Sequence, residues 1–382
     1  MTLASSAGRP VRIGLVSEFP PPGAGMTVQA ETLRRRLTED GLDVVAVRTN
    51  PPLRGALRPL GGVRFVRGLI AWCRYAWALR LLARVDLVHV FAISWLSFFL
   101  FAAPAVAVGR FLGRGVVVHF HGGNAAPFMH RLGWLALPFL RAAHRFVVPS
   151  SFLREVFSPW GLEVDTIDNP VDAARVEATS STDDPVVLSC RNLGPVYAIG
   201  TAIEAFALFS ATSPAARMIV AGDGPERGDL ERQAKAAGLQ DRIEFLGNVE
   251  HDDMAAVRSR ATILLNTSRV DNQPVSLIEA MAAGLPIVST DAGGIPCMVR
   301  NEAEALLSPV GDAASLARGL QRAATDAEVR DRVIAGGLAR ARAYRWAEVR
   351  QQWYRVYGEL LQHDQRPEGS SLESARRGRV RS

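Results

Sequence analysis

Short apolar runs rich in β-branched residues alternate with longer amphipathic segments along most of the chain. The first series begins with VRIGLVS and continues with DVVAVRT, LVHVF, GVVVHF and HRFVVPS, and the helical pattern TVQAETLRRRLTEDG follows its first run. A second series consists of PVVLSC, ARMIVAGDG, RIEFLG, ATILLN and LPIVST. Strands that alternate with helices in this way predict parallel sheets covered by helices on both faces. We therefore expect an α/β protein with two doubly wound domains.

The boundary between the two series is a polar stretch with turn-forming residues, IDNPVDAARVEATSSTDDP. Clusters of Asn-Pro, Ser, Thr and Asp are typical of linkers. We expect an N-terminal domain over residues 1–170, a linker over 171–182 and a C-terminal domain over 183–345. A helix over 346–362 and a disordered basic tail over 363–382 complete the predicted organisation.

The stretch from Leu87 to Gly109 contains no Asp, Glu, Lys or Arg and is long enough to span a bilayer. It contains Ser94, Ser97 and Pro104, however, and it divides into a strand-like LVHVF and a helix-like remainder. We expect a buried strand and helix of an α/β core.

Composition narrows the class of protein. Apolar residues make up 48% of the chain and charged residues 21%, as in folded globular proteins. The first ten residues lack the pattern of a signal peptide, which favours a cytoplasmic location. Cys73, Cys190 and Cys297 are widely separated, so the sequence indicates neither disulfides nor a zinc site.

The net charge of +6 is concentrated in one segment. Residues 51–85 contain seven arginines, between Arg54 and Arg84, and no acid, interleaved with Trp72, Tyr75 and Trp77. Such a mixture fits the headgroup region of an anionic membrane, and it fits equally a solvated helix face whose aromatic residues belong to the core. Lys235 is the only lysine, and we expect no nucleic-acid partner.

Ligands of parallel α/β sheets bind beyond the carboxyl ends of the strands. The first such loop contains Gly23-Ala-Gly25 ahead of a helix, where backbone amides can approach a phosphate. A dinucleotide fingerprint is a weaker interpretation, because Val28 stands where its third glycine would be. Another strand ends in His119-Phe120-His121 followed by two glycines. Metal ligands or core histidines are alternatives, but we interpret His121 as a cleft residue.

The second domain has two comparable strand ends. Arg191 follows PVVLSC, where a guanidinium can grip two phosphate oxygens. After ATILLN comes DNQPVSLIEAMAAGLP, in which Ser276 and Glu279 have the S-x-x-E spacing of a helix capping box. The capping box gives Glu279 a structural explanation, whereas Asp271 has none.

These motifs resemble the retaining glycosyltransferases of the GT-B fold in the large family-four group. Their signature is Glu, seven residues, Glu and then Ala-Met-Ala-x-Gly-x-Pro, and this chain differs only by Asp271 in the first position. The glycine loop, the HGG triplet, GDGPE, RIEFLG and DAGGIP also match, over residues 11–361. The resemblance implies two Rossmann-like domains facing a cleft, with a C-terminal helix that crosses back.

The resemblance also implies the chemistry. A UDP- or GDP-linked sugar would be held mainly by the C-terminal domain, an acceptor by the N-terminal domain, and no metal or other cofactor would be required. The catalytic candidates are His121, Asp271 and Arg191. The candidates for donor binding are Gly25, Arg191, Asn272, Gln273, Val275, Ser276 and Glu279, of which Glu279 would bind the ribose.

Three departures from the family pattern keep other functions open. Asp271 is one methylene shorter than the usual Glu, Asn272-Gln273-Pro274 replaces the common Gly-Phe-Gly, and no Lys follows Arg191. We expect a glycosyltransferase at the inner membrane face that acts on a glycan or lipid-linked acceptor of a surface or secreted polysaccharide. A catalytically inactive sugar-nucleotide or partner-binding module and a nucleotide-sugar epimerase are the alternatives.

Overall fold

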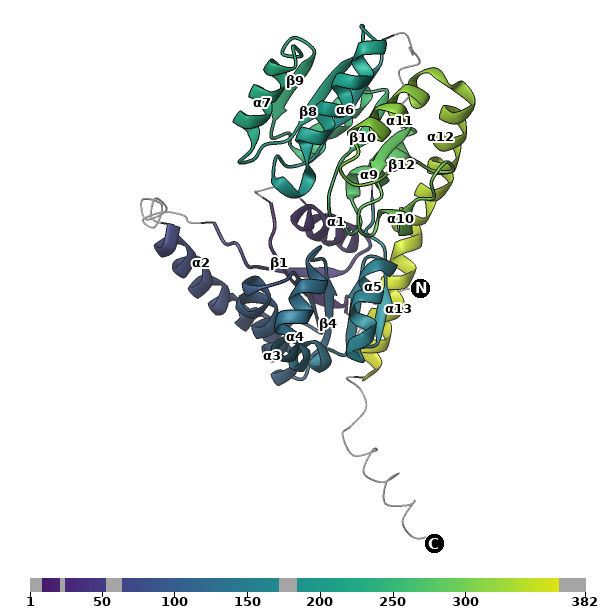
Figure 1. Cartoon of the computed structure of the whole chain (residues 1–382). Coiled ribbons are helices and arrows are strands. Elements are labelled where there is room, and N and C mark those ends of the chain that lie inside the picture. The colour runs from purple at the N-terminus through teal and green to yellow at the C-terminus, as the bar shows by residue number, and fades with distance from the viewer. Residues whose placement is uncertain (1–8, 21–24, 53–63, 172–183, 364–382) are drawn as a thin grey trace, which may run out of the picture.

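The computed structural model describes residues 9–20, 25–52, 64–171 and 184–363. These residues form two lobes, each built on a six-stranded parallel sheet surrounded by helices (Figure 1). The predicted α/β fold class with two doubly wound domains is confirmed. The expected linker over 171–182 and the expected tail over 363–382 lie almost wholly outside the described residues.

The N-terminal sheet has the strand order β2-β1-β3-β4-β5-β6. Its central strands are buried along their whole length because helices cover both faces, which explains their Val-rich composition. The strands are β1 Arg12–Ser17, β2 Asp43–Arg48, β3 Leu87–Ala92, β4 Gly115–Phe120, β5 Arg145–Val148 and β6 Val164–Thr166. The helices are α1 Met26–Glu39, α2 Arg64–Ala78, α3 Ala103–Phe111, α4 Ala125–Ala142 and α5 Ser151–Phe157.

The C-terminal sheet has the order β12-β11-β10-β7-β8-β9. Its winding direction reverses between β7 and β10, and ligands of such sheets bind at this reversal. The strands are β7 Val186–Ser189, β8 Arg217–Ala221, β9 Ile243–Gly247, β10 Ile263–Asn266, β11 Ile287–Thr290 and β12 Leu306–Ser308. The helices are α6 Ile199–Thr212, α7 Arg227–Ala236, α8 Met254–Ser259, α9 Val275–Ala283, α10 Ile295–Met298, α11 Ala313–Thr325 and α12 Ala327–Ala341.

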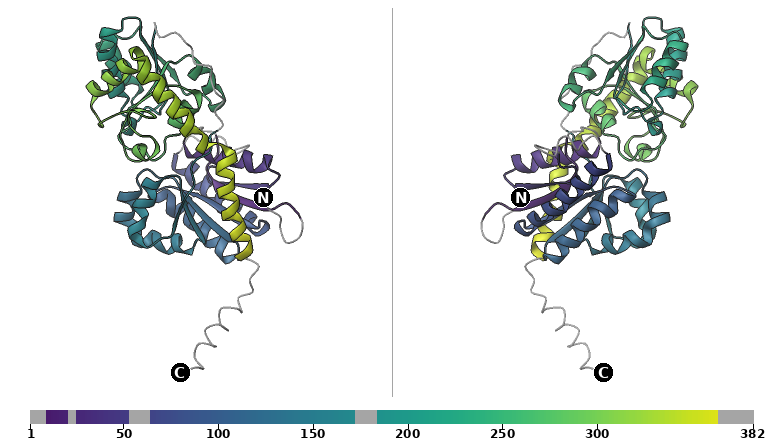
Figure 2. Two further views of the ribbon diagram at one scale, coloured as in Figure 1. Left: turned by 90° about the vertical axis from the view of Figure 1, so that its right-hand side faces the viewer. Right: turned by 90° about the vertical axis from the view of Figure 1, so that its left-hand side faces the viewer.

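The last helix returns to the first lobe. After α12 and the short 3-10 turn Arg342–Tyr344, helix α13 spans Trp346–His363 and runs along the N-terminal lobe (Figure 2). Its Val349, Trp353 and Tyr357 are completely buried in one apolar cluster with residues of β1 and α1. The N-terminal core is therefore completed by the far end of the chain.

The uncharged stretch that began at Leu87 forms β3, the π-helix Phe98–Ala102 and α3, as expected. Within the described part of the chain, one other stretch, Pro195–Thr212, is apolar and long enough to cross a membrane. It contains α6, whose Ile199, Ile203 and Phe206 lie in the core of the C-terminal lobe. Both apolar stretches therefore contribute buried strands or helices to the cores of the two lobes.

The arginine-rich segment is part core and part surface. Tyr75 of α2 is buried, and its hydroxyl donates a hydrogen bond to the Phe101 carbonyl at 2.5 Å. Trp77 is 70% exposed, with the Arg80 guanidinium 3.9 Å from its ring centroid. Arg54 and Arg58 lie outside the described residues. Tyr75 is a core residue, as expected for a solvated helix face with aromatic core residues, whereas Trp77 is exposed, as expected for a membrane-binding surface.

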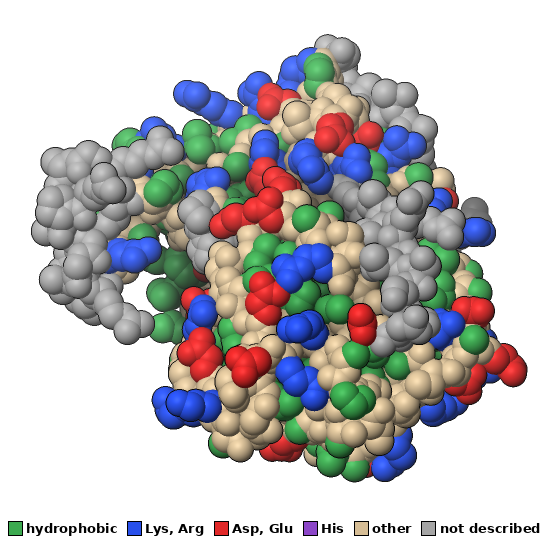
Figure 3. Space-filling view, turned by 90° about the horizontal axis from the view of Figure 1, so that it is seen from above, with side chains coloured by type: hydrophobic (Ala, Val, Ile, Leu, Met, Phe, Trp, Pro, Cys, Tyr) green, Lys and Arg blue, Asp and Glu red, His purple; other side chains and the backbone are tan. Residues whose placement is uncertain are grey.

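The outer face of the molecule, seen from above the C-terminal lobe, carries basic and acidic side chains interspersed with one another (Figure 3). Exposed ion pairs such as Arg232 with Asp229 and Arg260 with Glu244 belong to this lobe. This distribution is typical of a solvated surface.

Candidate active site

Arg191 and Asp271 meet at the point where the winding of the C-terminal sheet reverses. They follow β7 and β10, which are parallel neighbours, so their loops lie side by side. The Arg191 guanidinium donates a hydrogen bond to the Asp271 carboxylate, and these side chains are only 15% and 11% exposed. Tyr197 lies under the guanidinium, with 4.4 Å between its ring centroid and Cζ. This cation–π contact orients Arg191.

The loop that carries Asp271 is held by several hydrogen bonds. The carboxylate accepts from the Asn272 amide at 3.0 Å and from the Ser268 hydroxyl at 3.3 Å. The Asp271 carbonyl accepts from the Gly294 amide at 2.8 Å. A β-carbon on Gly293, whose φ is 55°, would collide with that carbonyl. The expectation that Asp271 has no structural role is therefore wrong.

The expected capping box is also wrong. Helix α9 begins at Val275 after Pro274, and no side chain caps it. The Glu279 carboxylate lies instead 2.7 Å from the Arg258 guanidinium and 3.7 Å from His251. Both members of the Glu279–Arg258 pair are at least nine-tenths buried. Sequence reasoning missed Arg258, because one arginine among many on a short helix gives no local signal.

Asn272 and Gln273 lie between the lobes. Both are buried, and their side-chain amides bind residues of the N-terminal lobe and of the segment that leaves it. Both residues also line the cleft, together with Val275 and Ser276. The Arg191 guanidinium approaches the Ser276 hydroxyl at 3.4 Å. Direct contacts of Asn272 and Gln273 with a nucleotide stay a prediction.

His121 faces the same cleft from the N-terminal lobe, directly after β4. It lies on the same side as His119, with ring centroids 4.0 Å apart. Its pKa is lowered to about 3 by burial, so the ring is neutral at pH 7. His119 is 3.3 Å from His89, and His89 is 2.8 Å from the Tyr357 hydroxyl of α13. The cleft histidine is therefore the outermost of three neighbouring histidines, of which His89 and His119 are buried in the lobe.

Gly25, like His121, lines the cleft from the N-terminal lobe. It precedes α1 with φ 52°, a left-handed conformation that favours glycine. Gly23, the other glycine of the expected loop, lies outside the described residues.

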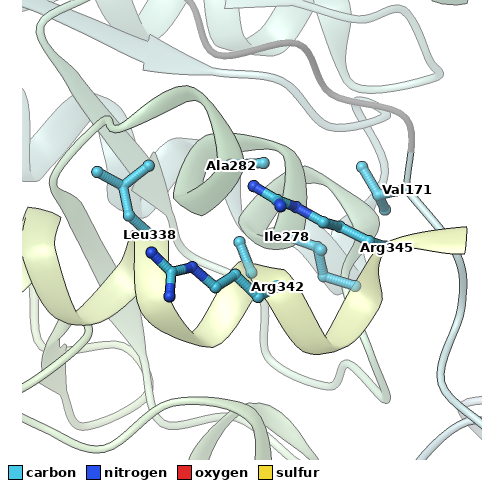
Figure 4. A pocket seen from close by; sticks show the side chains of 7 residues that line it. Val171, Ile278, Ala282, Leu338, Arg342 and Arg345 are labelled. Carbon is cyan, nitrogen blue, oxygen red and sulfur yellow. The ribbon is translucent and has the colours of Figure 1, made fainter. Parts of the chain in front are cut away.

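One cleft of about 480 Å³ brings all of these groups together, a size usual for small-molecule sites. Residues of both lobes line it, including every candidate named from the sequence: Gly25, His121, Arg191, Asp271, Asn272, Gln273, Val275, Ser276 and Glu279. A smaller cavity of about 180 Å³ lies beside α9, where α12 leads toward α13 (Figure 4). None of the candidate residues lines that cavity.

Two family models match the chain, one on each lobe. The glycosyl transferases group 1 model matches residues 171–340, and the glycosyltransferase family 4 model matches residues 23–175. The chain belongs to the group 1 glycosyltransferases of the GT-B fold. Within this family, the cleft between the lobes is the candidate site of sugar transfer.

Several proteins resemble this group 1 glycosyltransferase. A 2-deoxystreptamine N-acetyl-D-glucosaminyltransferase of Streptomyces fradiae is 28% identical over 337 residues, which cover 80% of this chain and 78% of the relative. A phosphatidyl-myo-inositol mannosyltransferase of Mycobacterium leprae is 35% identical over 133 residues, 34% of this chain and 36% of that relative. The crystal structure of Anabaena HepE in complex with UDP and glucose has a TM-score of 0.68 at 20% identity, covering 91% of this chain and 99% of that one. The structural likeness shows the shared fold.

Proposed function

We propose that this group 1 glycosyltransferase transfers a sugar from a UDP- or GDP-linked donor to an acceptor hydroxyl with retention of the anomeric configuration, without a metal or other cofactor. The observation that carries the proposal is the convergence of Arg191, Asp271 and Glu279 with His121 and Gly25 in one interdomain cleft. The first three come from the C-terminal lobe and the other two from the facing lobe, as a donor held between two domains requires.

The donor diphosphate would lie between Arg191 and the start of α9. A guanidinium grips phosphate oxygens in a fork, and the first amides of a helix attract anions. Pro274 has no N–H, so the amides of Val275 and Ser276 are the available donors. Negative charge grows on the leaving nucleotide during transfer, and preorganised donors at such a position are each typically worth about 10² to 10³ in rate.

Glu279 and Asp271 would bind two different parts of the donor. A carboxylate accepts hydrogen bonds from hydroxyl groups, and Arg258 holds the Glu279 carboxylate in place at 2.7 Å. We assign the ribose hydroxyls to Glu279 and the transferred sugar to Asp271. A neutral His121 would contact the sugar near the reacting carbon as a hydrogen-bonding group without adding positive charge. The acceptor would attack on the face that the nucleotide leaves.

We place the acceptor at the N-terminal lobe, next to the inner face of a membrane. Relatives named for phosphatidylinositol acceptors support a lipid-linked or glycan acceptor, here of a surface or secreted polysaccharide. On α2, the exposed side chains include Arg67, Leu69, Trp72 and Trp77. Basic and aromatic side chains on one exposed helix suit an anionic lipid surface.

The test begins with a thermal-shift panel of UDP- and GDP-sugars. A ligand at 100 times its dissociation constant stabilises a protein by about 2.7 kcal/mol, which is readily measured. The stabilising donor is then incubated with and without membrane extracts that contain lipid-linked glycans, and product stereochemistry is determined by NMR. Retained configuration in a glycosylated lipid supports the proposal. A converted donor without acceptor identifies an epimerase, and donor binding without any product identifies an inactive binding module.

A further inference from the structure

Two consecutive side chains of the 267–274 loop reach across the domain boundary. The Asn272 Oδ1 accepts a hydrogen bond from the Ser150 hydroxyl. The Gln273 Oε1 accepts from the Asn169 amide at 2.9 Å, and its Nε2 donates to Asp168 Oδ1 at 2.6 Å. Asn272 and Gln273 are only 7% and 6% exposed, so water competes little for these bonds.

The two side chains bind different parts of the neighbouring lobe. Ser150 is the N-cap of α5, and its hydroxyl also accepts from the Leu153 amide at 3.3 Å, so Asn272 is attached to the body of the lobe. Asp168 and Asn169 belong to the segment that leaves the lobe after β6. Gln273 is therefore attached at the place where the chain first crosses between the lobes.

The second crossing is tied to the first. The Val171 amide donates to the Tyr344 carbonyl at 3.0 Å, immediately before α13 begins. The small cavity of Figure 4 lies at this junction, lined by Val171, by Ile278 of α9 and by Arg342 and Arg345. Gln273 of the 267–274 loop is consequently bonded to the first crossing, and α9, which follows the loop, lines the cavity where the two crossings meet.

The same loop carries the cleft carboxylate. Asp271 immediately precedes Asn272, and its side chain pairs with Arg191 on the C-terminal lobe. A rotation that opens the cleft must break the Asn272–Ser150 bond or shift the peptide that carries Asp271. Hinge closure of this kind commonly completes a catalytic constellation.

We propose that Asn272 and Gln273 are positioning residues that fasten the 267–274 loop to the N-terminal lobe, so that cleft closure and the placement of Asp271 are one event. The inference deepens the proposed glycosyl transfer and rests on it for its kinetic readout. Residues 272–274 are where this chain departs from the Gly-Phe-Gly of similar glycosyltransferases, and two glycines and a phenylalanine have no side-chain amides to make these bonds.

The experiment compares Asn272→Ala and Gln273→Ala with variants that keep the hydrogen bonds. Asn272→Asp retains the oxygen that accepts from Ser150. Gln273→Glu alone places a second carboxylate beside Asp168, whereas Gln273→Glu combined with Asp168→Asn restores a donor and an acceptor. Gln321→Ala removes an exposed interhelical hydrogen bond to Thr212 on the C-terminal lobe and is the matched control.

Small-angle scattering of the full chain and steady-state kinetics with the donor are the readouts. We expect both alanine variants to have a larger radius of gyration and a donor KM raised at least tenfold. Asn272→Asp should recover the wild-type radius of gyration, the exchanged pair should recover both wild-type values, and Gln321→Ala should differ from the wild type in neither. If the alanine variants fail to fold, Gln273→Glu with and without Asp168→Asn provides the same comparison.

Two results overturn the inference. One is an unchanged radius of gyration together with an unchanged KM in the alanine variants. The other is a raised KM with an unchanged radius in both alanine variants, which would make these side chains direct donor ligands. Scattering needs no donor, so it tests the interdomain fastening even if the wild-type protein transfers no sugar.

Discussion

The Arg191 guanidinium is paired with the Asp271 carboxylate inside the cleft, although 80 residues separate them in the chain. The pair joins the cation expected to hold the donor diphosphate to the carboxylate expected to hold its sugar. Because a carboxylate next to a phosphate site repels a phosphate anion, the two residues have opposite effects on nucleotide affinity.

Substitution of either residue should lower the rate of sugar transfer, but only the Arg191 substitution should weaken nucleotide binding. Arg191→Gln should lower kcat/KM by about 10² to 10³ and weaken binding of the free nucleoside diphosphate. Asp271→Asn should lower transfer by a similar factor while binding the nucleoside diphosphate at least as tightly as wild type. Calorimetry with UDP and GDP measures the affinities, and weaker nucleotide binding by Asp271→Asn would contradict the assignment.

Substitutions at Glu279 and at its partner Arg258 distinguish the contribution of the pair to stability from the contribution of Glu279 to nucleotide binding. Arg258→Met leaves the Glu279 carboxylate buried without its cation, which should lower the free energy of unfolding by about 3 to 5 kcal/mol. Glu279→Gln keeps the shape but weakens hydrogen bonds from ribose, and we expect at least tenfold weaker nucleotide binding. Urea unfolding and calorimetry measure the two effects. A Glu279→Gln variant that binds nucleotide normally would show that Glu279 serves only the fold.

The three neighbouring histidines His89, His119 and His121 predict a pH dependence of stability. Burial lowers the pKa of His89 and of His121 to about 3, and it lowers the pKa of His119 well below its ordinary value. Below about pH 6.5 the unfolded chain binds protons that the folded protein excludes. The free energy of unfolding should therefore fall between pH 7 and pH 5.5, by about 1 kcal/mol per histidine.

The control for this effect is a variant with one histidine fewer. His89→Phe removes one titrating group, so urea unfolding across the same pH range should show a slope about one third shallower, whatever the stability of the variant at pH 7. A slope equal to that of the wild type would mean that other groups cause the pH dependence.

The exposed face of α2 predicts membrane binding. Arg67 lies on α2, and Arg80 lies on the 3-10 helix Leu79–Arg84 that directly follows it. Reversing these two charges by Arg67→Glu and Arg80→Glu should weaken binding to vesicles with anionic lipid at least tenfold, since each cation near such a surface contributes about 1 kcal/mol. The same net change on the other lobe, Arg232→Glu with Arg318→Glu, is the control. Vesicle sedimentation measures both, and equal binding by the two double variants would rule out a specific role for α2 and the 3-10 helix that follows it.

The central strands were predicted, and so were α1, α3, α9 and α13, because each of these segments carries its own pattern of apolar and polar residues. The edge strands β6 and β12 were missed, since three residues at the border of a sheet have too little alternation to stand out. The candidate residues after β4, β7 and β10 were identified because strand ends of a parallel sheet share one edge. The capping interpretation of Glu279 failed because its spacing is local, whereas its partner is a buried arginine on another helix.

The sequence alone therefore determined the alternation of strands and helices and the side chains presented at the strand ends. Only the tertiary structure decided their partners: Arg258 for Glu279, Ser150 for Asn272 and Tyr357 for His89. The two residues of these pairs are 21, 122 and 268 positions apart in the sequence, respectively. Such contacts depend on strand order and on the two crossings between the lobes, which are fixed by the packing of whole surfaces, and no local pattern of residues records them.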